Sequence, residues 1–455
     1  MGFTEERTNR DKTCHVKGAN DPAVDDAPAI RDAFAECNEN ANVVFENTTY
    51  HIFTVLNTTG LRNVDVEVRG TLEWNNDDID YWRNNSLYIG FQNQTSAWFF
   101  GGEQVHFYGH GYGTLNGHGE VWYKYSNGTS NLHGRPHQIT ISDSKDCVIE
   151  GLRFIRSQMW TSTIARSEQI LMQNIYVNNS CAPDADFDRC NLNTDGSDTV
   201  YANNSKYPLC GAACVAKANL PLLPIVTYLH WTYEGGDDAI APKQNSTNIY
   251  MADFDIHKGS GVALGSIGQY PGQIEILENF TARDIRLYGS QYGCRLKTWT
   301  GLNKGYPPNG GGGGIGHAKN LTCEGFTMDD MAIAAWSTNQ KTAFDEQPGG
   351  SNTSLFQYAL LVTADIALQI LTLSLYYRIE DLHFGNSHGT LSGELVTSFQ
   401  CSAEAPCEGV NLYNNSFTIA SNGSVPDVYR CTNVASSTGL ECTAGCGEDD
   451  ELCPS

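Results

Sequence analysis

Gly151-Leu152-Arg153-Phe154 and Asn174-Ile175-Tyr176-Val177 are two copies of one short pattern: a small or polar residue, an apolar residue, any residue, and a second large apolar residue. Apolar residues at alternate positions indicate short strands with one buried face. Leu152 and Ile175 are 23 positions apart, and so are Trp231 and Phe254 further on. The pattern recurs five more times, at residues 230–233, 253–256, 284–287, 325–328 and 381–384.

A strand-and-turn unit that returns every 20–30 residues or so is typical of a parallel β-helix, in which each coil stacks its apolar residues on those of the next. We therefore predict an all-β chain that forms one single-stranded, right-handed parallel β-helix domain over residues 14–455, with a Cys-rich C-terminal tail. A β-sandwich with irregular strand spacing is the alternative. Helical periodicity is confined to Pro28–Ala35, where a proline suits the first turn of a helix that caps the solenoid.

Two intervals break the repeat, because Ile175 to Trp231 and Phe326 to Leu382 each span 56 positions. Each interval holds a stretch unlike its surroundings, at residues 206–228 and 358–378. A surface insertion is expected to be polar, whereas these stretches are apolar. The second is long enough to cross a bilayer, but a membrane span within a solenoid would split its core. We interpret both as non-native insertions, that is, retained introns.

Charge and cysteine content limit the partners and the compartment. The net charge of −24 argues against binding to nucleic acid or to an anionic membrane, and a pI near 4.7 predicts an acidic pH optimum. Fifteen cysteines and many Asn-x-Ser/Thr sequons predict a secreted glycoprotein, although no signal peptide is visible at Met1. The late cysteines predict disulfide-stapled loops, with zinc at Cys442 and Cys446 as the alternative.

Three aspartates stand in two short motifs, Asn193-Thr194-Asp195 and Gly236-Asp237-Asp238, and Arg295-Leu296-Lys297 follows downstream. Inverting hydrolysis of a glycosidic bond needs one carboxylic acid at the leaving oxygen and a carboxylate that activates water, roughly 6.5–9.5 Å away. Adjacent carboxylates provide that contrast, because both cannot easily be ionised at once. Arginine and lysine suit an anionic sugar. The alternative for each motif alone is a solvated turn or an exposed strand.

These motifs, together with Gly261–Gly268, occur in the order found in family 28 of the glycoside hydrolases, the polygalacturonase family, which the chain resembles from about Cys14 to Cys442. The run Gly265–Tyr270 and Gly310–Gly314 are more similar to the fungal exo-acting branch. The resemblance implies the pectin-lyase-like β-helix and inverting, exo-acting cleavage of α-1,4-galacturonosyl linkages in pectin, without metal or cofactor. It also implies the following roles: Asp237 as general acid, Asp195 and Asp238 as bases, and Arg295 and Lys297 as ligands of the sugar carboxylate, with Asn193 as a further substrate contact.

One position departs from the family pattern. Polygalacturonases carry a histidine immediately before the glycine that corresponds to Gly261, and this chain has Ser260. Relatives that act on rhamnogalacturonan also lack it, so an exo-acting rhamnogalacturonan hydrolase or α-L-rhamnosidase is the second hypothesis. An inactive pectin-binding protein and a calcium-dependent lyase are rivals of other classes. We expect a monomer whose partner is a pectic polysaccharide.

Aromatic residues are candidates for stacking on sugar rings. Tyr270 is the one that we predict to bind substrate. The other candidates, which are more commonly core residues in such a fold, are Trp82, Trp98, Trp122, Tyr123, Trp160 and Trp299.

Overall fold

The computed structural model describes residues 10–181, 190–203, 224–299, 305–341, 377–402 and 405–445. The chain forms two compact units, which are described separately. The first contains Met1–Gly236 and Ser246–Phe254, and the second contains Asp237–Asn245 and Asp255–Ser455.

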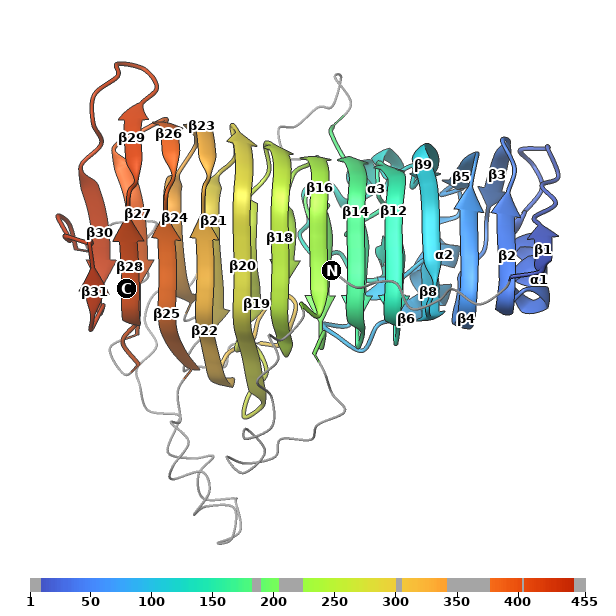
Figure 1. Cartoon of the computed structure of the whole chain (residues 1–455), viewed down its shortest axis with the longest axis horizontal. Helices are drawn as coiled ribbons and strands as arrows, with labels where there is room; N and C mark the ends of the chain where they lie inside the picture. Colours follow the sequence, from blue (N-terminus) through green and yellow to red (C-terminus); the bar gives the residue numbers. More distant parts are fainter. Residues whose placement is uncertain are drawn as a thin grey trace, which may run out of the picture. The chain divides into compact units, whose positions relative to one another are not determined.

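The first unit is a stack of parallel strands, as the repeat predicts. Its longest sheet grows by one strand per coil, and Figure 1 shows β12, β14 and β16 of this sheet side by side. A second sheet is built in the same way, and a short third one joins β9. The members of the first sheet are β1 (Lys12–His15), β2 (Glu39–Phe45), β4 (Leu56–Val68), β9 (His106–Asn116), β12 (Lys145–Ile155), β14 (Glu168–Asn178) and β16 (Val226–Glu234). Those of the second are β8 (Trp98–Glu103), β11 (Ile139–Ser142), β13 (Ser162–Ala165) and β15 (Ser197–Val200), and of the third β3 (Thr49–Ile52) and β5 (Thr71–Trp74).

Other elements of the first unit flank the coils. Strands β6 (Leu87–Tyr88), β7 (Thr95–Ser96) and β10 (Pro136–His137) form a small separate sheet. Helices α2 (Ile79–Asn85) and α3 (Glu120–Ser126) lie in the connections. Helix α1 (Ala27–Glu36) has its proline in the first turn and packs against β1 and β4, so the predicted N-terminal helix is confirmed.

The second unit repeats the same architecture, with every pairing parallel. Figure 1 shows its strands in colours from yellow-green to red. One sheet contains β17 (Asp238–Pro242), β19 (Gly261–Ile267), β21 (Tyr292–Trp299), β24 (Ala334–Lys341), β27 (Leu395–Gln400) and β30 (Val428–Thr432). A second contains β20 (Ile274–Tyr288), β22 (Ile315–Glu324), β25 (Tyr377–Gly385), β28 (Glu408–Tyr413) and β31 (Ser437–Thr438), and a third β23 (Thr327–Met331), β26 (His388–Leu391) and β29 (Ser416–Ile419). Strand β18 (Ser246–His257) carries the chain from one unit to the other.

The small or polar residue that opens each predicted repeat has a specific conformational role. All seven such residues, from Gly151 and Asn174 to Asp381, adopt left-handed backbone angles with φ between 54° and 71°. Glycine, asparagine and aspartate tolerate this conformation better than other residues. Each therefore bends a strand at a fixed place while the apolar residues on either side stay in the core. The parallel β-helix predicted from the sequence is confirmed.

The core consists of large apolar side chains that stack from one coil to the next. Ile175 of β14 lies level with Trp231 of β16, and the Trp231 ring stacks on Phe254 with ring centroids 5.6 Å apart. Both rings are buried. Such ladders remove large apolar surfaces from water in every coil.

The ends of the two stretches interpreted as insertions belong to strands. Val226–Tyr228 is the start of β16, and Tyr377 and Arg378 start β25, so each stretch is shorter at its C-terminal end than predicted. The other residues of the stretches lie outside the described residues, except Pro224 and Ile225, of which Ile225 is buried just before β16. Among the described residues, no helix is long and apolar enough to cross a membrane.

Five disulfides connect ten of the described cysteines, and Cys147 is buried as a free thiol. Cys401–Cys407 and Cys431–Cys442 confirm the predicted stapling of the C-terminal loops. Because Cys442 is bonded to Cys431, the zinc alternative at Cys442 is excluded in this state.

Replacing Trp231 with alanine should lower the free energy of unfolding by about 3–5 kcal/mol, since it leaves a large cavity between Ile175 and Phe254. Thr232→Ala, which changes the adjacent outward-facing residue, is the control and should cost much less. Chemical unfolding of both variants tests the ladder, and equal losses would contradict its role.

Candidate active site

Asp195 lies in the first unit, in the turn that leads into β15. Its side chain is 3% exposed. Its backbone carbonyl accepts a hydrogen bond from the backbone N–H of Thr161 at 2.8 Å, and the carbonyl of Gly196 accepts two from Ser162. The turn is therefore fixed to the preceding coil, which sets the place of the Asp195 carboxylate.

The buried side-chain amide of Asn179 is hydrogen-bonded to the turn that carries Asp195. Its Nδ2 donates to Thr161 Oγ1 at 2.8 Å and to the Thr194 carbonyl at 3.2 Å, and its Oδ1 accepts from the backbone N–H of Ser157 at 2.8 Å. Asn179 is completely buried, so these bonds are made away from water. Losing them would remove the buried bonds that tie the connection at residues 157–161 to the Asp195 turn.

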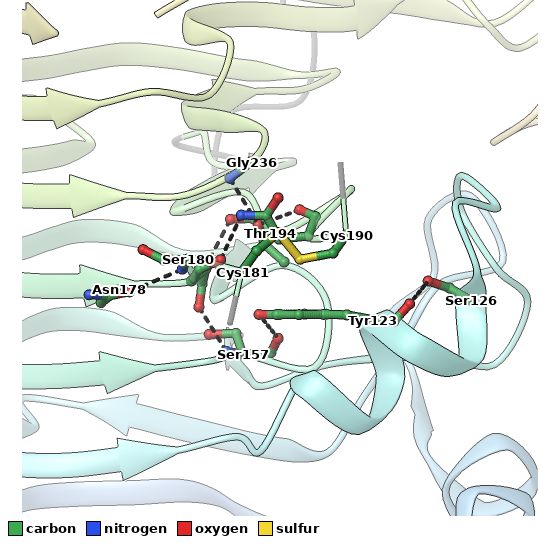
Figure 2. The surroundings of a disulfide bond; sticks show 11 residues. Tyr123, Ser126, Ser157, Asn178, Ser180, Cys181, Cys190, Thr194 and Gly236 are labelled. Atoms are coloured by element: carbon green, nitrogen blue, oxygen red, sulfur yellow. Dashed lines mark hydrogen bonds between the residues drawn. A yellow bond between two sulfur atoms is a disulfide. The ribbon is translucent and has the colours of Figure 1, made fainter. Parts of the chain in front are cut away.

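Thr194 connects the Asp195 turn to the chain segment that precedes the aspartate pair (Figure 2). Its Oγ1 donates to the carbonyl of Asn191 at 2.7 Å and accepts from the backbone N–H of Gly236 at 3.3 Å. The Tyr233 hydroxyl donates to the Thr194 carbonyl at 3.0 Å. A side chain on Gly236 would collide with Asn191, which explains the glycine at this position.

The disulfide between Cys181 and Cys190 closes the chain segment just before this turn (Figure 2). Asn191 follows it directly and donates from its Nδ2 to the Asn179 carbonyl at 2.7 Å. A cross-link over nine positions restricts the conformations that the segment can adopt. It therefore helps to hold Asn191 and, through it, Thr194.

Asp237 and Asp238 begin the second unit and stand at the start of β17. Asp237 directly follows Gly236, whose backbone N–H donates to Thr194 Oγ1. The backbone N–H of Asp238 donates to Asp237 Oδ1 at 3.0 Å. The glycine that is hydrogen-bonded to Thr194 therefore continues directly into the aspartate pair.

Lys297 is an ion-pair partner of Asp238. Its Nζ lies 2.5 Å from Asp238 Oδ2, and the Asp238 side chain is only 2% exposed. Breaking a buried pair by removal of one partner is costly, because the other charge stays behind without compensation. Sequence reasoning placed Lys297 near a sugar carboxylate and did not anticipate this contact.

Arg295 lies two residues before Lys297 on β21, so both side chains project from the same face of the strand. Its guanidinium carbon is 4.7 Å from the centre of the Tyr292 ring, a cation–π arrangement that orients the group. The guanidinium has the flat fork that binds a carboxylate through two hydrogen bonds. Lys243, another cation in this part of the chain, is buried and donates to the Gly265 carbonyl at 2.8 Å.

Ser260 is placed where its identity affects the aspartate pair. Its backbone N–H donates to the carbonyl of Asp237 at 2.9 Å, and Gly261 lies level with Asp238 on the neighbouring strand. The Ser260 side chain is buried. The residue that replaces the family histidine therefore sits beside the predicted general acid.

The two remaining predicted ligands are tied up in protein contacts. Asn193 Oδ1 accepts hydrogen bonds from the Asn131 backbone N–H at 2.7 Å and the Ser130 hydroxyl at 3.3 Å, and so holds a loop over the turn. Tyr270 is 9% exposed, and its ring is packed edge-on against Tyr306, which is 69% exposed. The other aromatic candidates, Trp82, Trp98, Trp122, Tyr123, Trp160 and Trp299, are all buried.

Glu275 is a functional candidate that the sequence pattern did not reveal. It is 1% exposed, and its oxygens accept hydrogen bonds from the backbone N–H groups of Gly268 at 2.7 Å and Tyr270 at 2.9 Å. Burial raises the pKa of Glu275 to about 7. An acidic residue at an inward position of a strand, next to a glycine-rich loop, is the signal that could have identified it.

Comparisons with known proteins agree with this architecture. A model of glycosyl hydrolases family 28 matches residues 37–207 and 226–305. The chain is 39% identical over 430 residues to an α-L-rhamnosidase of Aspergillus niger, covering 94% of this chain and 89% of that protein. It is 33% identical over 445 residues to a putative galacturan 1,4-alpha-galacturonidase A of the same species, covering 92% and 91%.

Solved structures show the same fold. An endo-xylogalacturonan hydrolase from Aspergillus tubingensis superimposes with a TM-score of 0.70 at 20% identity, over 95% of this chain and 99% of that one. An exopolygalacturonase from Thermotoga maritima superimposes with a TM-score of 0.63 at 14% identity, over 91% and 89%.

Fold, buried acidic groups and relatives together define a glycoside hydrolase built on a parallel β-helix. Within that class the chain belongs to glycosyl hydrolases family 28. The family match leaves residues 208–225 unmatched, inside the first stretch interpreted as an insertion. That interpretation stays a prediction for both stretches.

Replacing Asn179 with alanine should lower kcat/KM by about 100-fold and stability by about 2–3 kcal/mol, because the Asp195 turn loses its support from below. Asn178→Ala, at the half-buried neighbour, is the matched control. Steady-state kinetics and unfolding of both variants measure the difference. Similar activity in the two variants would refute the positioning role of Asn179.

Glu275 should make stability depend on pH. Since its pKa is raised from 4.5 to about 7, its favourable contribution is complete below pH 4.5 and is lost as the pH rises through about 7. The loss amounts to about 3 kcal/mol at most. Glu275→Gln should flatten the fall in unfolding free energy between pH 4.5 and 7.5, whereas Glu394→Gln, at an exposed position, should not. An unchanged slope in Glu275→Gln would exclude this origin.

Proposed function

We propose that the protein is a secreted, exo-acting hydrolase that removes terminal galacturonosyl residues from α-1,4-linked galacturonan by single displacement with inversion. Arg295 is the observation that carries the substrate assignment. Its partly buried guanidinium is oriented by Tyr292 on a strand that also bears Lys297. A fixed guanidinium fork is suited to the carboxylate of a uronic acid and has little use for a neutral sugar.

The roles of the aspartates follow from the charge placed next to them. Lys297 supplies a positive charge at Asp238, which suits this residue to act as a base. Asp237 takes the role of general acid for the leaving oxygen, because two neighbouring carboxylates divide the acid and base roles between them. Asp195, from the fixed turn after Thr194, acts with Asp238 to orient and deprotonate the attacking water.

A secreted location is supported by the disulfides. Five lie among the described residues, and such bonds persist in oxidising compartments and are rare in the cytosol. A pectic polysaccharide is also an extracellular substrate. Galacturonan carries many charges, so the local cations Arg295 and Lys297 offset the net negative charge of the protein at the binding site.

A second candidate is an α-L-rhamnosidase that acts on rhamnogalacturonan. Two observations favour it: Ser260 stands beside Asp237 in place of the family histidine, and the relative that is 39% identical is an α-L-rhamnosidase. In this case the terminal sugar is neutral, and Arg295 would hold the galacturonate on the other side of the cleaved bond.

Product analysis at mildly acidic pH separates the candidates. Galacturonic acid monomer from polygalacturonate supports the first, and rhamnose from rhamnogalacturonan supports the second. No product from either substrate would leave the inactive pectin-binding protein. Resistance to a chelator distinguishes hydrolysis from a calcium-dependent lyase, which would also produce unsaturated sugars.

Arg295→Leu should lower kcat/KM on polygalacturonate by about 100-fold, because an ionic hydrogen-bonding partner of the substrate carboxylate is lost. Arg378→Leu, at an arginine on β25, is the control and should retain activity. If the rhamnosidase assignment is correct, Arg295→Leu will impair release of rhamnose from rhamnogalacturonan but not from an aryl α-L-rhamnoside. Unchanged kinetics on every substrate would rule out Arg295 as a substrate ligand.

A further inference from the structure

Two loops of the second unit are fastened to each other at the end of β19. The first follows this strand at residues 268–273, and the second, at residues 305–314, precedes β22. Three backbone hydrogen bonds join them, from Gly312 to the Gln269 carbonyl at 2.8 Å, from Gly314 to the Gly268 carbonyl at 3.1 Å, and from Gly272 to the Gly313 carbonyl at 2.8 Å. Two loops thus form one supported structure, with their contact region largely buried and Tyr306 exposed.

Glycine is needed for this close approach. A side chain on Gly311 would come within 2.7 Å of the Gln269 carbonyl oxygen, and one on Gly314 within 2.6 Å of the backbone of Gly268. The glycine run therefore allows the second loop to lie directly on the first. Glu275 anchors the first loop from inside by accepting the backbone N–H groups of Gly268 and Tyr270.

The double loop carries the most exposed aromatic side chain among the described residues, Tyr306. It is 69% exposed, and its ring meets the ring of Tyr270 at 5.9 Å in an edge-to-face arrangement. An edge-to-face contact supports a ring while leaving at least one of its faces uncovered by the other ring. Tyr306 therefore presents an apolar surface that its supporting loops hold in place.

The loops that carry Tyr306 begin beyond the proposed substrate ligands, Arg295 and Lys297, along the same sheet. Ile267, the last residue of β19, lies level with Thr298, the residue after Lys297. A side chain on Gly268 would reach within 2.4 Å of the Trp299 carbonyl, so the double loop begins about two residues beyond Lys297. Two residues of a strand correspond to roughly 7 Å. A chain held at Arg295 and Lys297 can extend to the loops.

We propose that Tyr306, supported by Tyr270, is a specificity-determining subsite that binds a second sugar unit of the pectic chain by stacking on its apolar face. The inference rests on the proposed function, since it takes the substrate to be a pectic chain with its reacting unit at Arg295. It also explains why Tyr270, predicted from the sequence to stack on sugar, is buried: it supports the ring that does so.

The test compares substrates that can and cannot reach the loops. Tyr306→Ala should raise KM for a pectic trisaccharide roughly fivefold more than KM for the aryl glycoside of the same terminal sugar. Tyr306→Phe keeps the ring and should restore most of the affinity. Tyr88→Ala is the matched control, because Tyr88 is 62% exposed and lies in the first unit.

Equal changes of KM on both substrates, or none, would overturn the subsite. Failure of the proposed function is seen separately, as a wild-type protein that hydrolyses neither substrate. In that event calorimetric titration with oligogalacturonate and with rhamnogalacturonan oligosaccharides decides the question. A roughly fivefold weaker binding by Tyr306→Ala than by wild type supports the subsite, and equal binding or no binding by both refutes it.

Discussion

Each unit depends on the register between successive coils, which is fixed wherever the strands bend. Hydrogen bonds in a parallel sheet do not by themselves select one register, but a left-handed bend does, because only a few residue types adopt it without strain. Asn279 and Asn320 illustrate the result: both have left-handed backbones, they occupy adjacent coils, and Asn320 Nδ2 donates to Asn279 Oδ1 at 2.8 Å. A slip by one residue would place asparagine in the core and an apolar residue in the bend.

The candidate active site uses this register to place charged groups that would otherwise be expensive to bury. Asn179 bonds to two turns of the chain only because neighbouring coils lie at fixed heights, and Lys297 meets Asp238, which is 59 positions away in sequence. The ion pair adds little net stability when the cost of desolvation is included. The value of both contacts is also positional, since hydrolysis with inversion depends on the separation of an acid and a base.

The fold could be predicted because its main constraint is local in sequence: a bend residue followed by alternating apolar residues. The candidate site could be predicted only as far as its motifs extend. The exposure of Tyr306 and the burial of Tyr270 result from glycine contacts between two loops, which no single motif describes. The density of sequons has a second physical source, because Asn279, Asn320 and Asn414 have left-handed backbones that favour asparagine whether or not a glycan is attached.

Two sets of titratable side chains, whose pKa values are shifted in opposite directions, together favour the folded state at acidic pH. The hydrogen bond to Glu120 raises the pKa of His118, and burial raises that of Glu275, so both contributions to stability are lost as the pH rises through their folded values. Hydrogen bonds to Arg69 and His317 lower the pKa values of Glu67 and Glu278, and these contributions disappear as the pH falls through theirs. Three of them, those of His118, Glu67 and Glu278, are complete between about pH 4.5 and 6.5, the ordinary values for glutamate and histidine, and that of Glu275 declines across this range. Near the lower end of that window the net charge is also small, since the pI is about 4.7, so an anionic polysaccharide approaches with little repulsion from the protein as a whole.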